Sequence, residues 1–302
     1  MRTVLLTTTS VLLLALAGCG EASKPAPTPS STATPKPTEA PEVVVNSIDD
    51  ALAGNWRPAA GKARDAFRHP KETLEFFEVG PTETVVEIWP GGGWYTSILA
   101  PYLKAEGKYI AAGFDPDTSD YAKRGTEAFA ENYVSKPNIY GTITVAKLGP
   151  DTGPITEPNS VDTVLTFRNV HNWMSNGYAD KVFADMFAVL KPGGILGVVE
   201  HRLPSSETQN PKAGNGYVHE DYVKQLAADA GFEFVGASEI NANPKDTADH
   251  PFGVWTLPPN KRSKARDGSV PEGFDAAKYE AIGESDRMTL KFKKPMPETP
   301  EE

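Results

Sequence analysis

Residues 85–96 decide the fold of this chain, and they read Val-Val-Glu-Ile-Trp-Pro-Gly-Gly-Gly-Trp-Tyr-Thr. A short β-branched run ends in the acid Glu87 and predicts a strand, while the apolar residues after Thr96 have helical spacing. The glycines between them let the backbone approach a ligand closely. The N-terminus of the following helix points its free N–H groups at the same place. The stretch therefore predicts a strand–loop–helix unit with a ligand-binding loop.

A second strand tip carries another acid. About 20 residues after the glycines, the apolar run 109–114 ends at Asp115. A carboxylate at this position can accept hydrogen bonds from ribose hydroxyls, so the two strand ends outline a nucleoside-cofactor site. The pattern of a nicotinamide dinucleotide site is incomplete, because it needs a glycine where the chain has Thr96.

Further strands and helices follow in alternation. Residues 161–167 predict a strand with a polar tip at 168–173, and the next helix stops at Leu-Lys-Pro-Gly-Gly, residues 190–194. The remaining strands are expected at residues 195–200, 232–237 and 288–293. Helices between most of these strands imply a seven-stranded, mostly parallel sheet covered on both faces, which is a Rossmann-like α/β fold.

Two motifs resemble those of class I S-adenosylmethionine-dependent methyltransferases. The first runs acid-x-Gly-x-Gly-x-Gly, with Glu87 as the acid and Gly91 and Gly93 as the last two glycines, and Trp89 replaces the first. The second is the helix, Leu-Lys-Pro-Gly-Gly and apolar strand described above. The resemblance covers residues 80–294 and implies an antiparallel last strand, S-adenosyl-L-methionine as cofactor and a set of cofactor-binding residues: Glu87, Trp89, Gly91, Gly93 and Asp115.

Candidate catalytic and substrate-binding residues follow the strand at 161–167. His171 is the first candidate general base for a hydroxyl or ammonium acceptor, with Asn169 beside it and His201 as a weaker alternative. Candidate substrate contacts are Arg168, Trp173 and Tyr95. The simpler alternatives are a loop histidine bonded to a backbone carbonyl and aromatic residues that belong to the core. No cluster of His, Cys and acidic residues has the spacing of metal ligands, so no metal is expected.

The N-terminus has the features of an export signal. Arg2 and a short apolar run precede Leu16-Ala17-Gly18-Cys19, which resembles a bacterial lipobox, so residues 1–18 are expected to be a lipoprotein signal peptide. Cys19, the single cysteine, would be lipidated, and the Pro/Thr/Ser-rich residues 19–46 would form a tether. The alternative is an ordinary cleaved signal with an incidental cysteine. Gly20, where an aspartate would retain the lipoprotein in the inner membrane, predicts the periplasm with an outer-membrane anchor.

Composition is consistent with one globular domain at residues 47–294, followed by a disordered tail at 295–302. Within it, residues 47–79 are expected to form a helical cap and residues 241–287 a lid-like insertion. The net charge of -10 argues against a nucleic-acid partner. It also argues against direct binding of the protein surface to anionic lipid, so the lipid anchor is expected to provide the membrane contact.

Two functions are compatible with these observations. The first is an exported, lipid-anchored methyltransferase that acts on a small molecule or an envelope component. The second is a methyltransferase-like module that binds an adenosyl compound or another ligand without transfer. Export separates the domain from the cytosol, where S-adenosylmethionine is made, and Trp89 departs from the first motif. The later motifs favour the enzyme.

Overall fold

The computed structural model describes residues 43–297. The predicted signal peptide, Cys19, most of the predicted tether and the last five residues of the tail lie outside the described residues. Within the described part, no helix is both long and apolar enough to cross a membrane.

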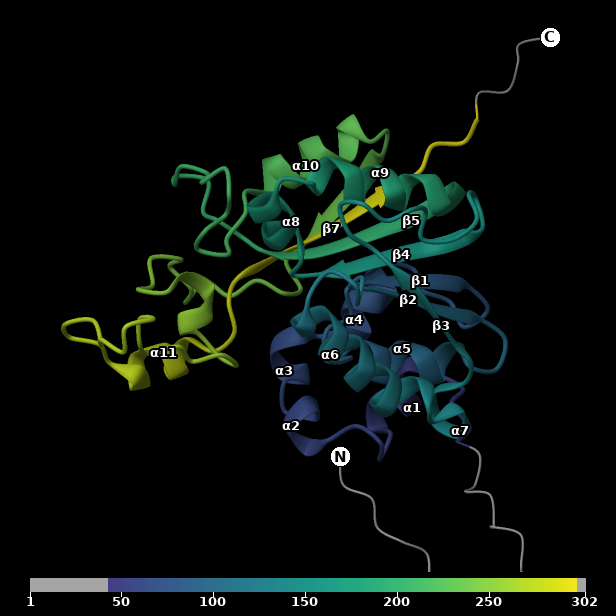
Figure 1. Ribbon diagram of the computed structural model, residues 1–302, viewed down its shortest axis with the longest axis horizontal. Coiled ribbons are helices and arrows are strands. Elements are labelled where there is room, and N and C mark those ends of the chain that lie inside the picture. The colour runs from purple at the N-terminus through teal and green to yellow at the C-terminus, as the bar shows by residue number, and fades with distance from the viewer. Residues whose placement is uncertain (1–42, 298–302) are drawn as a thin grey trace, which may run out of the picture. The chain divides into compact units, whose positions relative to one another are not determined.

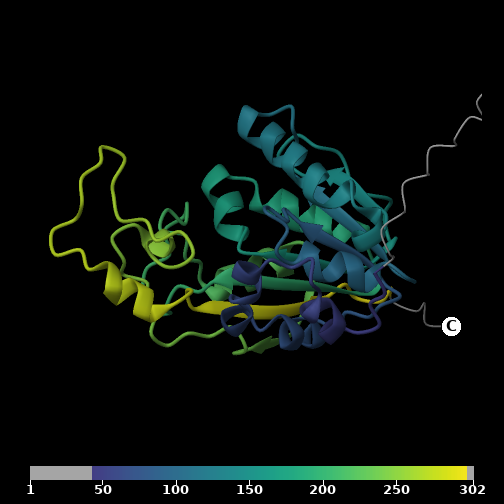
Figure 2. The ribbon, with the colours of Figure 1, turned by 90° about the horizontal axis from the view of Figure 1, so that it is seen from below.

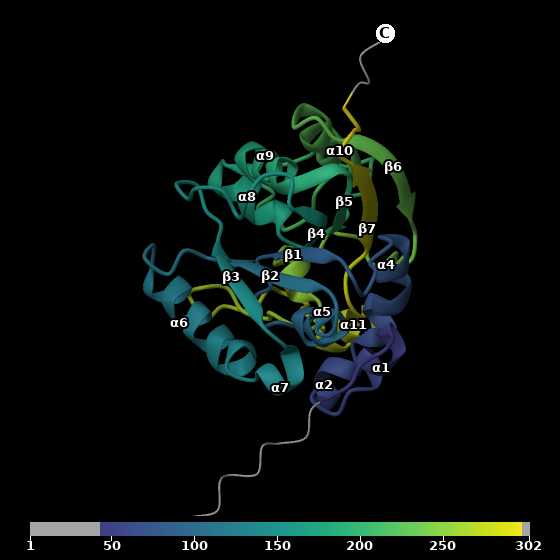
Figure 3. The same cartoon turned by 90° about the vertical axis from the view of Figure 1, so that its right-hand side faces the viewer.

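A seven-stranded sheet forms the centre of the domain, and its strand order is β3-β2-β1-β4-β5-β7-β6. β7 is antiparallel to both of its neighbours, while the other adjacent pairs are parallel, so the predicted fold class is confirmed (Figure 3). The strand bounds are β1 Thr84–Ile88, β2 Lys108–Gly113, β3 Ile143–Lys147, β4 Val161–Phe167, β5 Leu190–His201, β6 Glu233–Ser238 and β7 Arg287–Lys293.

Helices cover both faces of this sheet (Figures 1 and 3). On one face lie α8 Val170–Asn176, α9 Ala179–Val189 and α10 Glu220–Asp229. The other face carries α1 Ile48–Ala53, α4 Pro70–Phe76, α5 Thr96–Leu103, α6 Asp120–Phe129, the π-helical turn Ala130–Val134 and α7 Pro137–Tyr140. The short helices α2 Ala59–Lys62 and α3 Asp65–Arg68 join α1 to α4.

The central strands are apolar on both sides because each face has its own core. Val86 and Val164 belong to the core beneath α8, α9 and α10, whereas Val85 and Leu165 belong to the core beneath α1, α4 and α5. Successive side chains of a strand point to opposite faces, so adjacent residues necessarily enter different cores. This arrangement explains the continuous apolar runs that identify these strands in the sequence.

One boundary differs from the sequence-based expectation. β5 begins at Leu190 and includes the Lys-Pro-Gly-Gly stretch, which was expected to be a turn before the strand. Leu190 pairs with Val161 of β4, and Gly193 and Gly194 exchange backbone hydrogen bonds with Lys294, just beyond β7. Pairing with two neighbouring segments therefore extends the strand through residues that have a low intrinsic preference for it.

Two segments lie outside the alternation of strands and helices along the chain, one before β1 and one between β6 and β7. Residues 47–79 contain α1 to α4. Residues 239–286 connect β6 to β7 and contain the 3-10 turn Gly253–Thr256 and α11 Ala276–Ile282. Because β7 runs opposite to the parallel strands, this connection lies beyond their carboxyl ends (Figure 2). The connection is thereby placed where open α/β sheets bind ligands, and residues 57–68 of the first segment line the same cavity.

Candidate active site

A cavity of about 590 Å³ lies at the carboxyl ends of β1 and β4. The chain connects β1 toward β2 and β4 toward β5 on opposite sides of this point, so the cavity occupies the topological switch point of the sheet. Its walls come from the loop after β1, the tips of β4 and β5, the helical segment 47–79 and the insertion. Its size is typical of small-molecule sites.

The loop after β1, residues 89–94, is called the glycine loop below. Gly91 and Gly93 have φ angles of 58° and 74°, and Trp89, in the place of the first glycine of the motif, has φ 46°. The backbone at Trp89 therefore adopts a conformation that favours glycine. Its side chain donates from Nε1 to the Leu148 carbonyl at 3.0 Å and packs against Phe114 at a ring distance of 4.3 Å.

Glu87 lies at the base of the glycine loop and is 3% exposed. Its Oε2 accepts hydrogen bonds from the Tyr109 hydroxyl at 2.5 Å and from Thr96 Oγ1 at 3.1 Å. Burial raises the pKa of Glu87 to about 7, although these hydrogen bonds oppose the shift. The carboxyl group is therefore close to half protonated at neutral pH and borders the cavity.

Asp115 follows β2 but does not line the cavity of the switch point. Its Oδ1 forms an ion pair with Lys147 at 2.8 Å and accepts a hydrogen bond from the Asp117 amide. The hydrogen bond from Lys147 lowers the pKa of Asp115. A second, mostly apolar cavity of about 340 Å³ lies between the glycine loop, β2 and α6, and its lining includes Gly113 and Phe114, immediately before Asp115.

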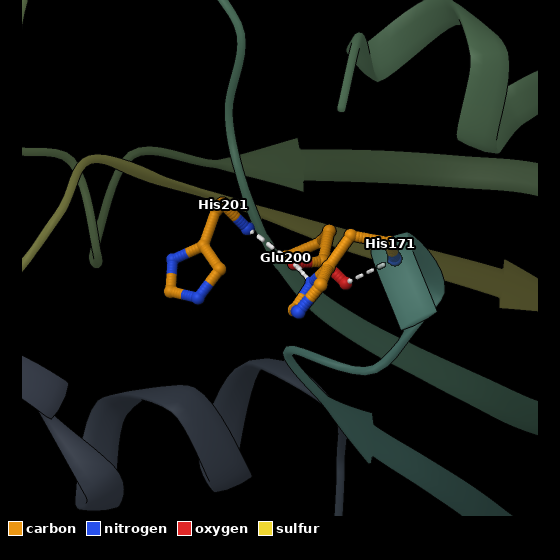
Figure 4. A group of neighbouring side chains, drawn as sticks. All are labelled: His171, Glu200 and His201. Atoms are coloured by element: carbon orange, nitrogen blue, oxygen red, sulfur yellow. Dashed lines mark hydrogen bonds and ion pairs between the residues drawn. The ribbon is translucent and has the colours of Figure 1, made fainter. Parts of the chain in front are cut away.

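His171 lies in the first turn of α8, and its ring contacts the carboxylate of Glu200 near the end of β5 (Figure 4). His171 Nδ1 is 3.0 Å from Glu200 Oε1. Glu200 also accepts the backbone N–H groups of Val170 at 2.6 Å and His201 at 2.8 Å, which fixes the orientation of its carboxylate. A carboxylate beside Nδ1 favours the tautomer that carries its proton there, so Nε2 is available as a proton acceptor.

His201 lies on the other side of Glu200, and its Nδ1 is 2.5 Å from Ser285 Oγ of the insertion (Figure 4). Burial and the nearby His171 and Arg168 lower its pKa well below the ordinary value. His201 is therefore a neutral imidazole at physiological pH.

Among the described residues, His171, Glu200 and His201 form a group whose possible ligand atoms lie within 4.8 Å of one another. Sequence reasoning missed this group because Glu200 ends an apolar strand and has no local motif. Both oxygens of Glu200 already accept backbone N–H groups, and the positive charges that lower the pKa of His201 also oppose a cation. The His171–Glu200 pair has the geometry of an oriented histidine base.

The other predicted site residues have different surroundings. Asn169 lines the cavity and donates from Nδ2 to the Ile88 carbonyl at 2.9 Å, which joins the tips of β4 and β1. Tyr95 also lines the cavity and stacks on Phe167 at a ring distance of 3.6 Å. Arg168 lines it as well, with a left-handed φ of 63°.

The expectation that Trp173 contacts a substrate is not supported by its position. Its side chain is fully buried in the core beneath α8 and α9, where it packs against Trp89 and Phe183. The helix of residues 170–176 turns this ring toward the sheet and away from the cavity. Trp173 therefore belongs to the core, and we do not retain it as a substrate contact.

The sequence predicted a lid-like insertion, but it did not indicate which residues of the two outer segments line the cavity. Residues 57–68 contribute Arg57, Arg64 and Arg68, and the insertion contributes Trp255, Glu284 and Ser285. Neither segment has a recognisable motif, so no local pattern links these residues to the glycine loop.

Comparisons with known proteins agree with this architecture. No protein-family model matches the chain, and no curated protein matches it. Among solved structures, the [4+2]-cyclase SpnF is similar with a TM-score of 0.51 and 15% identity, over 80% of this chain and 86% of that protein. A SAM-dependent methyltransferase from Aquifex aeolicus has a TM-score of 0.46 and 18% identity, over 65% and 93% of the two chains. A putative methyltransferase from Bacillus halodurans has a TM-score of 0.47 and 13% identity, over 76% and 100%.

Identities this low relate the chain to other proteins by fold and not by activity. The similarity to SpnF and the strand order support the same conclusion as the sequence motifs. The chain has a Rossmann-like α/β fold with a seven-stranded, mostly parallel sheet, as the sequence motifs predicted.

Proposed function

We propose that this protein is an S-adenosylmethionine-dependent methyltransferase that acts on a small molecule or an envelope component. The observation that carries the proposal is the cavity at the switch point, which is lined by the glycine loop and by His171. Fold alone does not determine activity, so the argument depends on the chemistry of these groups.

The residues of the glycine loop are suited to hold the cofactor. A side-chain carbon added to Gly91 would meet no atom within 4 Å, so its backbone is accessible to a ligand. Glu87 borders the same cavity, and Asp115 follows the strand beside the second cavity. S-Adenosylmethionine would supply an electrophilic methyl group at this site.

His171 is suited to accept the proton of the methyl acceptor. Methyl transfer to a hydroxyl or an ammonium group requires a base, and Nε2 of His171 is the free acceptor of the ring. Glu200 stabilises the positive charge that the ring acquires with the proton, because it forms the hydrogen bond to Nδ1. The insertion closes the site near this base, since the Trp255 ring lies edge-on to His171 at 6.0 Å.

The second candidate is a module that binds an adenosyl compound or another ligand without transfer, and one contact of the glycine loop bears on how either candidate binds a ligand. The Tyr133 hydroxyl donates to the carbonyl oxygens of Gly92 and Gly93 at 2.9 and 3.0 Å. A side-chain carbon on Gly93 would lie only 2.3 Å from the Tyr133 ring, so this ring covers part of the glycine loop. Tyr133 must move before a ligand can contact that part of the backbone.

We further propose that the protein is exported and anchored through Cys19, which rests on the lipobox-like Leu16-Ala17-Gly18-Cys19 sequence. Metabolic labelling with palmitate tests this placement. We expect label in the unmodified protein and none in the Cys19→Ser variant. Label that persists in the variant would exclude Cys19 as the lipidated residue.

The methyltransferase proposal is tested with the purified full-length protein. Calorimetric titration with S-adenosylmethionine and S-adenosylhomocysteine measures cofactor binding. Methyl-tritiated cofactor, incubated with an envelope extract, then reports transfer. We expect binding of both compounds and a labelled acceptor. Binding without any labelled acceptor would favour the binding module, and no binding at millimolar concentration would refute both functions for an adenosyl ligand.

A further inference from the structure

The cavity has a concentration of buried and half-buried arginine side chains in and beside its lining that the proposed methyl transfer does not use. Arg64 and Arg68 come from the helical segment, Arg168 from the tip of β4 and Arg287 from the start of β7, and Glu284 precedes Arg287. We call these five residues the arginine cluster. All except Arg287 line the cavity itself.

Glu284 is the carboxylate around which the cluster is organised. It accepts from Arg64 Nε at 2.6 Å and from Arg68 Nε at 3.1 Å, and Arg287 Nη1 lies 3.3 Å from it. One carboxylate thus faces three guanidinium groups, and Arg168 adds a fourth positive charge to the cluster. The cluster therefore has an excess of positive charge in a buried place.

Three of these arginines have unused hydrogen-bonding capacity within the described part of the chain, and the first is Arg64, whose Nη2 has no hydrogen-bond partner. Arg68 is 2% exposed, and its Nη1 has no hydrogen-bond partner. The side chain of Arg168 forms no hydrogen bond or ion pair with another described residue, although it lines the cavity. A buried donor without a partner is costly unless a ligand satisfies it.

The electrostatics of the cluster point in the same direction. Burial and the charge of Arg168 lower the pKa of Arg68 to about 9, and burial and the charge of Arg287 lower that of Arg168 to about 10. All of these groups remain charged at neutral pH. A bound anion would reduce both the burial cost and the mutual repulsion of these side chains.

We propose that the arginine cluster is a subsite for the carboxylate or phosphate group of the methyl acceptor, held by Arg68 and Arg168. A guanidinium group presents paired donors that match the oxygens of either anion. The inference rests on the proposed function in assigning this anion to a methyl acceptor, but the subsite does not itself require methyl transfer.

The neighbouring residues indicate what the anion is attached to. Trp94, Tyr95 and Phe167 line the same cavity, and Arg68 lies over the Trp94 ring at 4.6 Å. Flat apolar surfaces beside a charged group suit an aromatic or other apolar body with a single acidic substituent. The acceptor class is therefore an organic acid or a phosphate ester with an apolar part.

The test uses benzoate as the carboxylate probe, benzamide as its neutral isostere and inorganic phosphate as the second anion. Each is titrated calorimetrically into the full-length protein at constant ionic strength, set with chloride. We expect benzoate or phosphate to bind in the millimolar range and benzamide to bind at least tenfold more weakly than benzoate. Which anion binds more tightly identifies the acidic group of the acceptor. Equal binding of benzoate and benzamide with no binding of phosphate, or no binding of either anion, would overturn the proposal.

Two variants with opposite expected effects separate an anion subsite from a purely structural cluster. Arg168→Gln should weaken binding of the anion by about tenfold or more, because a charge-assisted hydrogen bond is lost. Glu284→Gln should strengthen it, because the internal carboxylate no longer competes for the same donors. Arg266→Gln, at an exposed position of the insertion, is the matched control and should bind as the unmodified protein does. Thermal unfolding of each variant verifies that the fold is retained.

Anion affinity that does not change in Arg168→Gln would refute the assignment. Titration with S-adenosylhomocysteine is performed in parallel on the same samples. Anion binding without S-adenosylhomocysteine binding supports the subsite while refuting the proposed cofactor. The reverse result leaves the cofactor site in place and refutes the subsite.

Discussion

The glycine loop and the arginine cluster both contribute to the lining of the cavity, but they differ in how the chain builds them. The glycine loop is continuous in sequence, and its ligand-binding groups are backbone atoms made accessible by Gly91 and Gly93. The arginine cluster is assembled from side chains as far apart in sequence as Arg64 and Arg287, and one carboxylate, Glu284, holds three of them.

This difference assigns different roles to the glycine loop and the arginine cluster. A backbone loop at a switch point can serve the same cofactor in many proteins, since it needs little from the surrounding side chains. The residues that contact an acceptor must vary with the acceptor. Here Arg64, Arg68 and Glu284 lie on segments added to the common fold, whereas Arg168 lies at the tip of β4. His171, which is oriented by Glu200, lines the same cavity and would connect the cofactor to the acceptor.

Replacement of His171 should have the largest effect on activity, and it should lower the rate of methyl transfer without changing cofactor binding. Without the base, His171→Ala should lower turnover by about 10²–10⁴-fold and leave the affinity for S-adenosylhomocysteine nearly unchanged. Steady-state kinetics and calorimetry measure the two quantities. His219→Ala, outside the cavity, is the control. Full activity in His171→Ala would mean that positioning suffices or that His201 is the base.

The protonation of Glu87 should be visible in stability as a function of pH. Its pKa in the folded protein, about 7, exceeds the ordinary value of 4.5, so folding favours the protonated form. The resulting stabilisation is complete below pH 4.5 and is lost as the pH rises through 7, with a magnitude on the order of 3 kcal/mol. Urea unfolding between pH 4 and pH 8 should show this loss, and Glu87→Gln should flatten it relative to the exposed control Glu106→Gln. A parallel pH dependence in both variants would contradict the assignment.

Asp115 tests whether the cofactor side includes the tip of β2. If Asp115 accepts hydrogen bonds from the ribose hydroxyls, Asp115→Ala should weaken the binding of S-adenosylhomocysteine by about 1.5–3 kcal/mol. Turnover at saturating cofactor should change little. Asp117→Ala is a matched control, because Asp117 also pairs with Lys147, at 2.8 Å. Equal losses in the two variants would attribute the effect to Lys147 instead.

Adjacent glycines of the loop provide the smallest and most specific comparison. An added side-chain carbon meets nothing within 4 Å at either Gly91 or Gly92, but only Gly91 has a left-handed φ, of 58°. Gly91→Ala should therefore cost about 1–2 kcal/mol of unfolding free energy from backbone strain alone, and Gly92→Ala should cost less. Denaturant unfolding measures both. Indistinguishable stabilities would show that the loop relaxes out of this conformation.

Much of the fold was predictable from the sequence because the determining signals are local. The run ending at Glu87, the glycines after it and the Leu-Lys-Pro-Gly-Gly stretch each specify backbone structure over a few residues. Buried parallel strands also require apolar residues on both faces, which makes them recognisable one at a time. The same local patterns predicted that the site residues follow the ends of strands, and the cavity lies there. These residues are Glu87, Gly91, Asn169 and His171.

Only the tertiary structure could decide which side chains meet at these tips. Glu200 comes to His171 because β4 and β5 are neighbours, and Trp173, adjacent in sequence to the polar tip, is turned into the core by the helix that begins there. The arginine cluster depends on the packing of the helical segment 47–79 against the end of the insertion. Such contacts join residues more than 200 positions apart, for example Arg68 and Glu284, and no pattern within either segment encodes their pairing. Local sequence determines backbone conformation, whereas the chemistry of this cavity is determined by side chains that only the complete fold brings together.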